Sequence, residues 1–375
     1  MGEKLERGLD KEIIDFIMDN PQGIALKNLL TNLKGLDVFV GIRNNYIDIY
    51  YEAFGAMNIG INASGATCKT NNKFWGNNHK DGYREIEISS ENLSECIKGI
   101  KRHIYESATR EDVKTRRYYK EKRCQHQIIL KNNLNDLSDW YCVDMEYVLQ
   151  RKDASEDSYG RFDIVAISKH INPKSQKYDV ALIELKVDSG AFDSAGKKTK
   201  TTVETWSEAV DTLWRKGKKV TLQNREINKF GSGILGHFSD YVRYMASDGF
   251  NKLKREICNI ISNKRALGLC TEDLFADLDV AKISEVPQIV FLIYARDEKE
   301  SSLITKFNNR VNCRCKYSIG NVWDKNIIDE YKRNSIIKCI IKQYPFANKE
   351  VLDFRLFSDV EISEAKNIFD EEAYK

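Results

Sequence analysis

The middle of the chain changes from helical to strand-like hydrophobic spacing and then back again. Apolar residues three and four positions apart predict a long helix from Thr109 to about Asn132. β-rich runs bounded by polar, turn-forming segments predict strands at 140–150, 161–168, 179–187 and 287–295. Helical spacing returns before the last of these strands, at 201–219 and 232–264. This order predicts a core from 109 to 300, in which a helix precedes a three-stranded meander.

The segments on either side of this core have patterns of their own. From 1 to 108, two amphipathic helices, a run of strands and a closing helix predict a small α+β accessory unit. Ser90 is the expected N-cap of the closing helix. From 301 to 375, the spacing predicts a helical covering segment. The predicted fold class is therefore α/β (α+β).

Composition and charge exclude several protein classes. With 42% apolar and 31% charged residues, the chain is expected to be neither disordered nor a membrane protein. The apolar run from Ile289 is too short to cross a bilayer, and the amino terminus lacks a secretory h-region, so we expect a cytoplasmic protein with no membrane partner. The nine cysteines have no paired CxxC spacing, which favours reduced thiols over a zinc site.

Charged residues interrupt the apolar strands of the predicted core. Glu184 and Lys186 are two residues apart, so they lie on one face of their strand. Asp163 interrupts the preceding strand, and it can share a face with Glu184 if the two strands are neighbours. Two close carboxylates resist joint ionisation unless a cation lies between them, and oxygen ligands suit Mg²⁺ or Mn²⁺ better than zinc. The sequence therefore predicts a divalent-metal site.

The order of these elements and charges resembles the PD-(D/E)XK nuclease superfamily, which has the restriction-endonuclease-like fold. The resemblance covers about 109–300 and implies a mixed central sheet flanked by helices. It also implies that Asp163, Glu184 and the main chain of Leu185 bind the metal, while Lys186 assists catalysis. The proline that gives the motif its name is absent, because Phe162 precedes Asp163. Many members of this divergent family lack it.

Many such nucleases carry a further acid on the first core helix. Glu121 is the expected residue, because Cys124, Gln125 and other inward-facing positions follow it at helical spacing. Glu146 on the first predicted strand is the alternative, since it could reach the site if its face matches that of Asp163. Helix spacing alone does not decide between the two acids.

Local basic clusters indicate where a nucleic-acid backbone could lie. The first core helix carries several basic residues beside Glu121, a loop after Lys186 carries more, and His237 lies near a predicted helix start. Side chains of these kinds contact phosphates. The residues expected to bind nucleic acid are Arg116, Arg117, Lys120, Arg123, Lys197, Lys198 and His237.

Together, these features predict a cytoplasmic, Mg²⁺-dependent nuclease that acts on nucleic acid, with DNA as the favoured substrate. The resemblance implies a place in bacterial defence or restriction, with a homo-oligomer or a defence-system partner. A catalytically silent nucleic-acid-binding or assembly protein with the same fold is the main alternative. A metal-dependent enzyme for nucleotides or small phosphoesters is a third.

Overall fold

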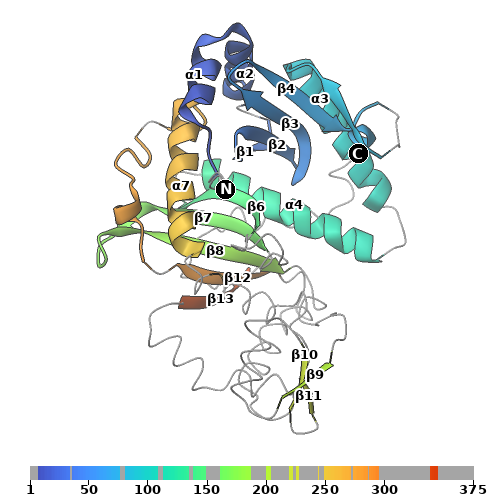
Figure 1. Cartoon of the computed structure of the whole chain (residues 1–375). Helices are drawn as coiled ribbons and strands as arrows, with labels where there is room; N and C mark the ends of the chain where they lie inside the picture. The colour runs from blue at the N-terminus through green and yellow to red at the C-terminus, as the bar shows by residue number, and fades with distance from the viewer. Residues whose placement is uncertain are drawn as a thin grey trace.

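Strands from distant parts of the chain form one mixed sheet (Figure 1). In spatial order, its strands are β13 (Lys338–Tyr344), β12 (Gln288–Tyr294), β8 (Lys177–Lys186), β7 (Arg161–Asn172) and β6 (Trp140–Val148). β6, β7 and β8 form an antiparallel meander, whereas β12 and β13 run parallel to β8. The predicted meander and the later strand are therefore confirmed, in a mixed α+β architecture.

The computed structural model describes residues 7–33, 36–76, 81–108, 113–134, 138–148, 161–186, 200–203, 219–222, 225–227, 244, 249–271, 273–285, 287–294 and 338–344. None of the helices in these ranges is long and apolar enough to cross a membrane.

A helix packs against each face of the mixed sheet. α4 (Val113–Leu134) and the side chain of Ile183 belong to one hydrophobic cluster. α7 (Gly249–Ala266) and Leu182 belong to the other. Neighbouring residues of a strand point to opposite faces, so β8 contributes to both clusters and is buried on both sides. The predicted first core helix is confirmed as α4, which ends close to the expected position.

The N-terminal part of the chain forms an antiparallel sheet with helices on one face. Its strands, in order, are β1 (Val38–Ile42), β2 (Tyr46–Tyr51), β3 (Phe54–Asn62), β4 (Gly65–Asn71) and β5 (Tyr83–Ile86). The helical elements are α1 (Lys11–Asp19), α2 (Pro21–Thr31), the 3-10 helix η1 (Asn72–Phe74) and α3 (Ser90–Ala108). The fully buried side chains of Ile47 and Ile49 alternate along β2 and join the cluster that contains all three α-helices.

The cap of α3 is one residue from the expected position. The Ser89 hydroxyl accepts a hydrogen bond from the Asn92 N–H at 3.2 Å, and Ser90 is the first helical residue. The prediction of Ser90 as N-cap was therefore wrong by one position. Two adjacent serines offer the same capping group, so spacing could not separate them.

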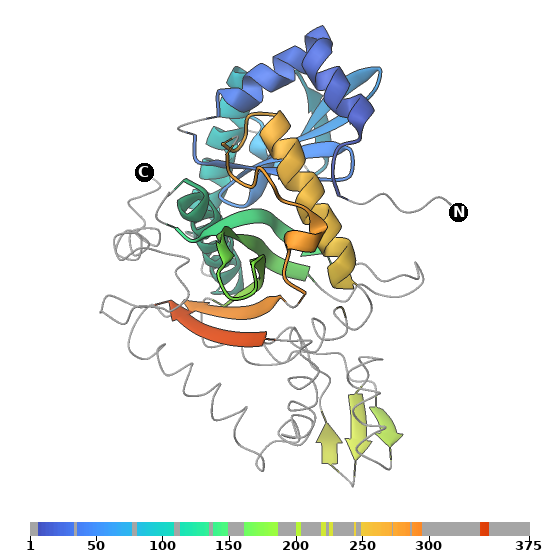
Figure 2. The ribbon, with the colours of Figure 1, turned by 90° about the vertical axis from the view of Figure 1, so that its left-hand side faces the viewer.

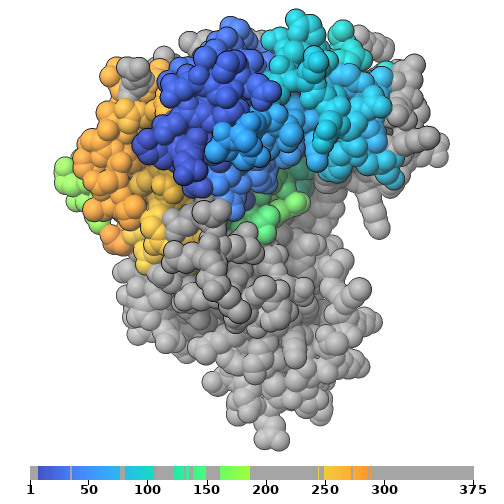
Figure 3. All heavy atoms as spheres, turned by 45° about the horizontal axis from the view of Figure 1, so that its top comes forward, coloured from blue at the N-terminus to red at the C-terminus, as the bar shows by residue number. Residues whose placement is uncertain are grey.

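The N-terminal sheet and the mixed sheet share one hydrophobic cluster, which contains Ile42 and Leu182. The N-terminal part of the chain also lies against the region of α7 (Figure 3), and the Leu9 N–H donates to the Asn263 side chain at 2.8 Å. Between the sheets, Arg43 donates to the carboxylate of Asp144, which is 1% exposed. The two predicted units are therefore packed together.

Two parts of the predicted helical regions are strands. Lys338–Tyr344 was expected within the helical covering segment, yet it is β13, beside β12 at the edge of the mixed sheet (Figure 2). Thr201–Val203, expected to start a helix, belongs to β9 (Lys200–Val203), which pairs with β10 (Lys219–Leu222) and, through it, with β11 (Arg225–Ile227). Lys200–Val203 has three consecutive β-branched residues and Lys338–Tyr344 has two adjacent isoleucines, and such residues pack well on a pleated surface.

Candidate active site

The candidate site lies at the end of the pairing between β7 and β8. Ile164 pairs with Ile183, and the same register sets Asp163 directly opposite Glu184. The Asp163 carboxylate accepts a hydrogen bond from the Leu185 N–H at 2.7 Å, so a side chain joins the two strands at this point. The structure therefore brings together Asp163, Glu184 and the main chain of Leu185.

Both acids are buried. Glu184 is 2% exposed and Asp163 is 7% exposed, and an ionised carboxylate in such a place requires hydrogen bonds or a positive charge. β8 continues to Lys186, whose main chain pairs with Ile293 of β12. The side chain of Lys186 lies outside the described part of the structure.

Gln125 of α4 contacts the candidate site, although the sequence analysis assigned it no role there. Its side-chain amide is 2% exposed and donates to the main-chain carbonyl of Asp163 at 2.6 Å. The contact fixes α4 to the residue whose carboxylate also holds β8. The signal was present in the sequence, because Gln125 is a polar residue on the inward stripe of a helix that carries Glu121.

Glu146 lies in the same cross-strand row as the two acids. The register of β6 against β7 sets it opposite Asp163. Its φ of 53° is a left-handed conformation, which costs a non-glycine residue on the order of 1–3 kcal/mol. One carboxylate oxygen lies 3.0 Å from Lys122 Nζ and the other lies 2.5 Å from Arg161 Nη1. Any role as a metal ligand would compete with these two ion pairs.

Glu121 lies on the same face of α4 as Gln125. It is one turn before Gln125, and residues four apart leave a helix on the same face. The side chain of Glu121 is half-buried. Burial raises the pKa of the neighbouring Cys124 thiol, and the charge of Glu121 adds to this rise. Of the two acids, Glu146 is therefore the one that the strand register places opposite Asp163.

Arg123 does not lie at a nucleic-acid surface, so this predicted contact was wrong. It is 7% exposed, and its Nε lies 3.1 Å from Glu52 at the turn between β2 and β3. Burial lowers the pKa of Arg123 and raises that of Glu52, although each charge opposes the shift of the other. The residue therefore connects α4 to the N-terminal sheet.

The other predicted phosphate contacts are not placed by the described residues. The side chains of Arg116, Arg117 and Lys120 lie outside the described part, although their main chain belongs to α4. Lys197, Lys198 and His237 lie outside it entirely.

No group of three or more His, Cys, Asp or Glu side chains in the described ranges is arranged to hold a metal ion. The groups that could bind a metal ion at the site are the carboxylates of Asp163 and Glu184 and the main chain of Leu185. Comparisons of the chain with protein-family models, curated proteins and solved structures find no match.

Proposed function

We propose that this protein is a metal-dependent nuclease of the PD-(D/E)XK kind that hydrolyses phosphodiester bonds in nucleic acid, with DNA as the first substrate to test. The observation that carries the proposal is the position of Asp163 opposite Glu184, with the Asp163 carboxylate bound to the Leu185 N–H. The helix that precedes the meander and the parallel strand beside β8 support the restriction-endonuclease-like fold.

The donor chemistry at the site suits Mg²⁺ or Mn²⁺. Asp163 and Glu184 offer carboxylate oxygens, and the Leu185 carbonyl is the neighbouring main-chain oxygen of β8. Hard cations prefer such oxygen ligands, whereas no cysteine or histidine is needed. When bound, the ion would acidify a water molecule and neutralise charge on the phosphate.

The residues of the chain would have separate roles in binding the ion and in catalysis. Asp163 and Glu184 would hold the ion, and Gln125 would keep Asp163 in position through its main chain. Lys186, two residues after Glu184, would orient the attacking water or stabilise charge on the phosphate. Hydrogen bonds and packing on both sides of β8 would keep this arrangement rigid.

The test is cleavage of plasmid, single-stranded DNA and RNA in Mg²⁺, Mn²⁺ or EDTA. The wild type should cut at least one substrate in the presence of the metal, and Glu184→Gln and Lys186→Met should each abolish cutting. Glu12→Gln, which changes an exposed acid of α1, is the matched control and should cut normally. Melting temperature measured with and without Mn²⁺ gives a second readout, since a ligand that binds the folded state stabilises it.

Two further variants test which additional acid, Glu121 or Glu146, takes part in cleavage. Glu121→Gln should reduce cutting if the acid on α4 takes part, and Glu146→Gln should do so if the acid on β6 does. Cleavage that survives Glu184→Gln would refute the proposed site. Binding of nucleic acid without any cutting would instead favour the silent binding protein.

A further inference from the structure

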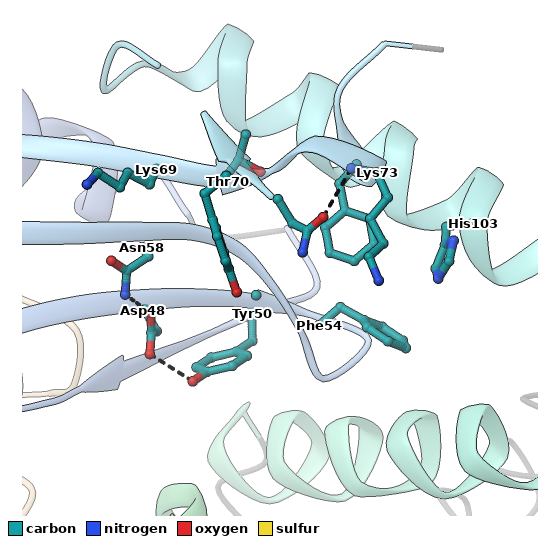
Figure 4. Close-up of a pocket in the computed structure, with 12 residues that line it drawn as sticks. Asp48, Tyr50, Phe54, Asn58, Lys69, Thr70, Lys73 and His103 are labelled. Atoms are coloured by element: carbon teal, nitrogen blue, oxygen red, sulfur yellow. Dashed lines mark hydrogen bonds between the residues drawn. The ribbon is translucent and has the colours of Figure 1, made fainter. Parts of the chain in front are cut away.

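A hollow of about 630 Å³ opens on the N-terminal sheet, and nothing in the proposed nuclease site involves it (Figure 4). Ile47 and Ile49 of β2 point into the hydrophobic cluster, so Asp48 and Tyr50 point to the other face, and the hollow extends from these two residues to His103 of α3. Its volume lies within the range of about 300–1,000 Å³ that small-ligand sites occupy. The sheet therefore presents a recess to solvent.

A polar row crosses the sheet at one side of the hollow. The registers of β2 to β5 align Asp48, Asn58, Lys69 and Glu85. The Asp48 carboxylate accepts hydrogen bonds from the Asn58 amide at 2.7 Å and from the Tyr50 hydroxyl at 2.9 Å. Because Asn58 uses an amide hydrogen on Asp48, its oxygen is the group suited to accept a hydrogen bond from a ligand.

Gly55 of β3, an exposed glycine, lines the hollow. Gly55 pairs with Tyr50, and the pairing of β2 with β3 shifts by one residue at this point. A Cβ placed on Gly55 would meet no atom within 4 Å. The absence of a side chain therefore leaves room for a ligand, and a larger residue could occupy that room without a steric clash.

Aromatic rings also line the hollow. The rings of Phe54 and Phe74 are 6.0 Å apart and edge-on, and His103 of α3 lies 5.5 Å from Phe74. Tyr83 on β5 lines the same hollow and is 71% exposed. Such a large ring gains little from packing when it is this exposed, yet its face can stack on a planar ligand.

The charge of the lining favours an anion. Lys69 and Lys73 both line the hollow, whereas the charge of Asp48 is shared with its two donors and with Arg43 Nε at 3.5 Å. Lys69 also lies 3.7 Å from Glu85, but both side chains are exposed, so this ion pair is worth little. Both lysines can therefore attract a phosphate.

We propose that this hollow binds a nucleotide. The base stacks on Tyr83 and Phe54, its edge bonds to Asn58, and the lysines on either side of the hollow, Lys69 and Lys73, attract its phosphates. The nucleotide is either free in solution or an unpaired unit of a single strand, because both present the same ring and phosphate. The inference does not depend on the proposed nuclease activity.

The test is isothermal titration of the full chain with each of the four ribonucleoside triphosphates and with a short single-stranded DNA. The protein carries Glu184→Gln and the buffer contains EDTA, so that the candidate active site does not consume the probes. Tyr83→Ala should weaken binding about tenfold or more, as expected for loss of one base–aromatic stack. Tyr83→Phe retains the ring and should bind normally.

Two matched pairs of variants locate the site. Gly55→Leu places a side chain in the hollow and should abolish binding, whereas Gly65→Leu, whose Cβ makes an ordinary contact at 3.5 Å with Gln22, should not. Lys69→Ala with Lys73→Ala should weaken binding most at low salt. The control removes the same charge elsewhere, through Lys11→Ala with Lys98→Ala, both exposed lysines.

The possible outcomes distinguish a free nucleotide from an unpaired unit of a single strand, and they can also overturn the proposal. Saturable binding of a triphosphate that Gly55→Leu abolishes identifies a free nucleotide. Binding of the single strand alone, with the same sensitivity to Gly55→Leu, identifies an unpaired unit of a nucleic acid. The proposal is overturned if no probe binds, or if binding is unchanged in both Tyr83→Ala and Gly55→Leu.

Discussion

Lys264 of α7 carries a buried ammonium group. Its removal should stabilise the protein at low pH and destabilise it at high pH. The side chain is 2% exposed, and its Nζ donates to the Val143 carbonyl at 2.9 Å. Val143 is the extra residue of a bulge in β6, so this carbonyl lies where the ladder with β7 is interrupted. The ammonium also lies 4.5 Å from the ring centre of Phe39. Burial lowers the pKa of Lys264 to about 7.

The sign and magnitude follow from the difference between the folded and unfolded states. The ordinary pKa of lysine is 10.5, so between pH 7 and pH 10.5 the unfolded chain binds a proton that the folded chain lacks. Stability therefore rises with pH across this range, and below pH 7 the full cost of about 5 kcal/mol remains. Lys264→Met removes this cost but leaves the Val143 carbonyl without its donor, which costs about 1–3 kcal/mol. The variant should be more stable by about 2–4 kcal/mol at pH 6 and less stable above pH 10.5.

Urea unfolding of the wild type and Lys264→Met between pH 6 and pH 10.5 measures this difference. Groups that titrate elsewhere are common to both proteins and cancel in the comparison. Lys252→Met, on the same helix and half-buried, is the control and should give a nearly constant difference. A difference for Lys264→Met that does not change with pH would refute the reasoning.

Further predictions concern contacts that fix the fold around the site. Arg123→Met leaves the Glu52 charge buried and should lower the free energy of unfolding by about 3–5 kcal/mol, while affinity for DNA, measured on folded protein, stays unchanged. Gly99→Ala should lower the melting temperature severely, because its Cβ would lie 1.9 Å from the Phe74 carbonyl oxygen, whereas Gly55→Ala should be neutral. Gln125→Leu should lower the free energy of unfolding, measured in urea, by about 1–3 kcal/mol and should reduce any cleavage rate. An unchanged cleavage rate would show that Gln125 does not support the site.

Local spacing predicted α4 and the three-stranded meander because their patterns were unambiguous. The meander could be predicted because each strand is a short β-rich run between polar turns. The helix α4 could be predicted because its pattern is too long for a strand. Asp163 and Glu184 could be singled out as candidates because each interrupts an apolar strand. β13 was missed because a short apolar run with isoleucines three and four apart fits a buried parallel strand and a helix equally well.

Contacts between distant segments were beyond the reach of the sequence. Arg123 belongs to a basic helix by spacing, and the partner that buries it, Glu52, lies 71 positions earlier. Glu146 could be placed on a strand, but its left-handed conformation depends on the pairing of β6 with β7. The hollow on the N-terminal sheet requires the register of four strands, which spacing along the chain does not supply.

The cluster shared by the two sheets has a consequence for synthesis on the ribosome. Leu9 bonds to Asn263, 254 positions later, so α1 to β5 emerge long before the helix that completes their core. At about 5–20 residues per second, this interval is on the order of tens of seconds. During that time, apolar side chains such as Ile17 and Ile42 lack part of their final packing. The nascent chain is therefore expected to engage chaperones until α7 docks, and an isolated fragment that ends at 108 should aggregate.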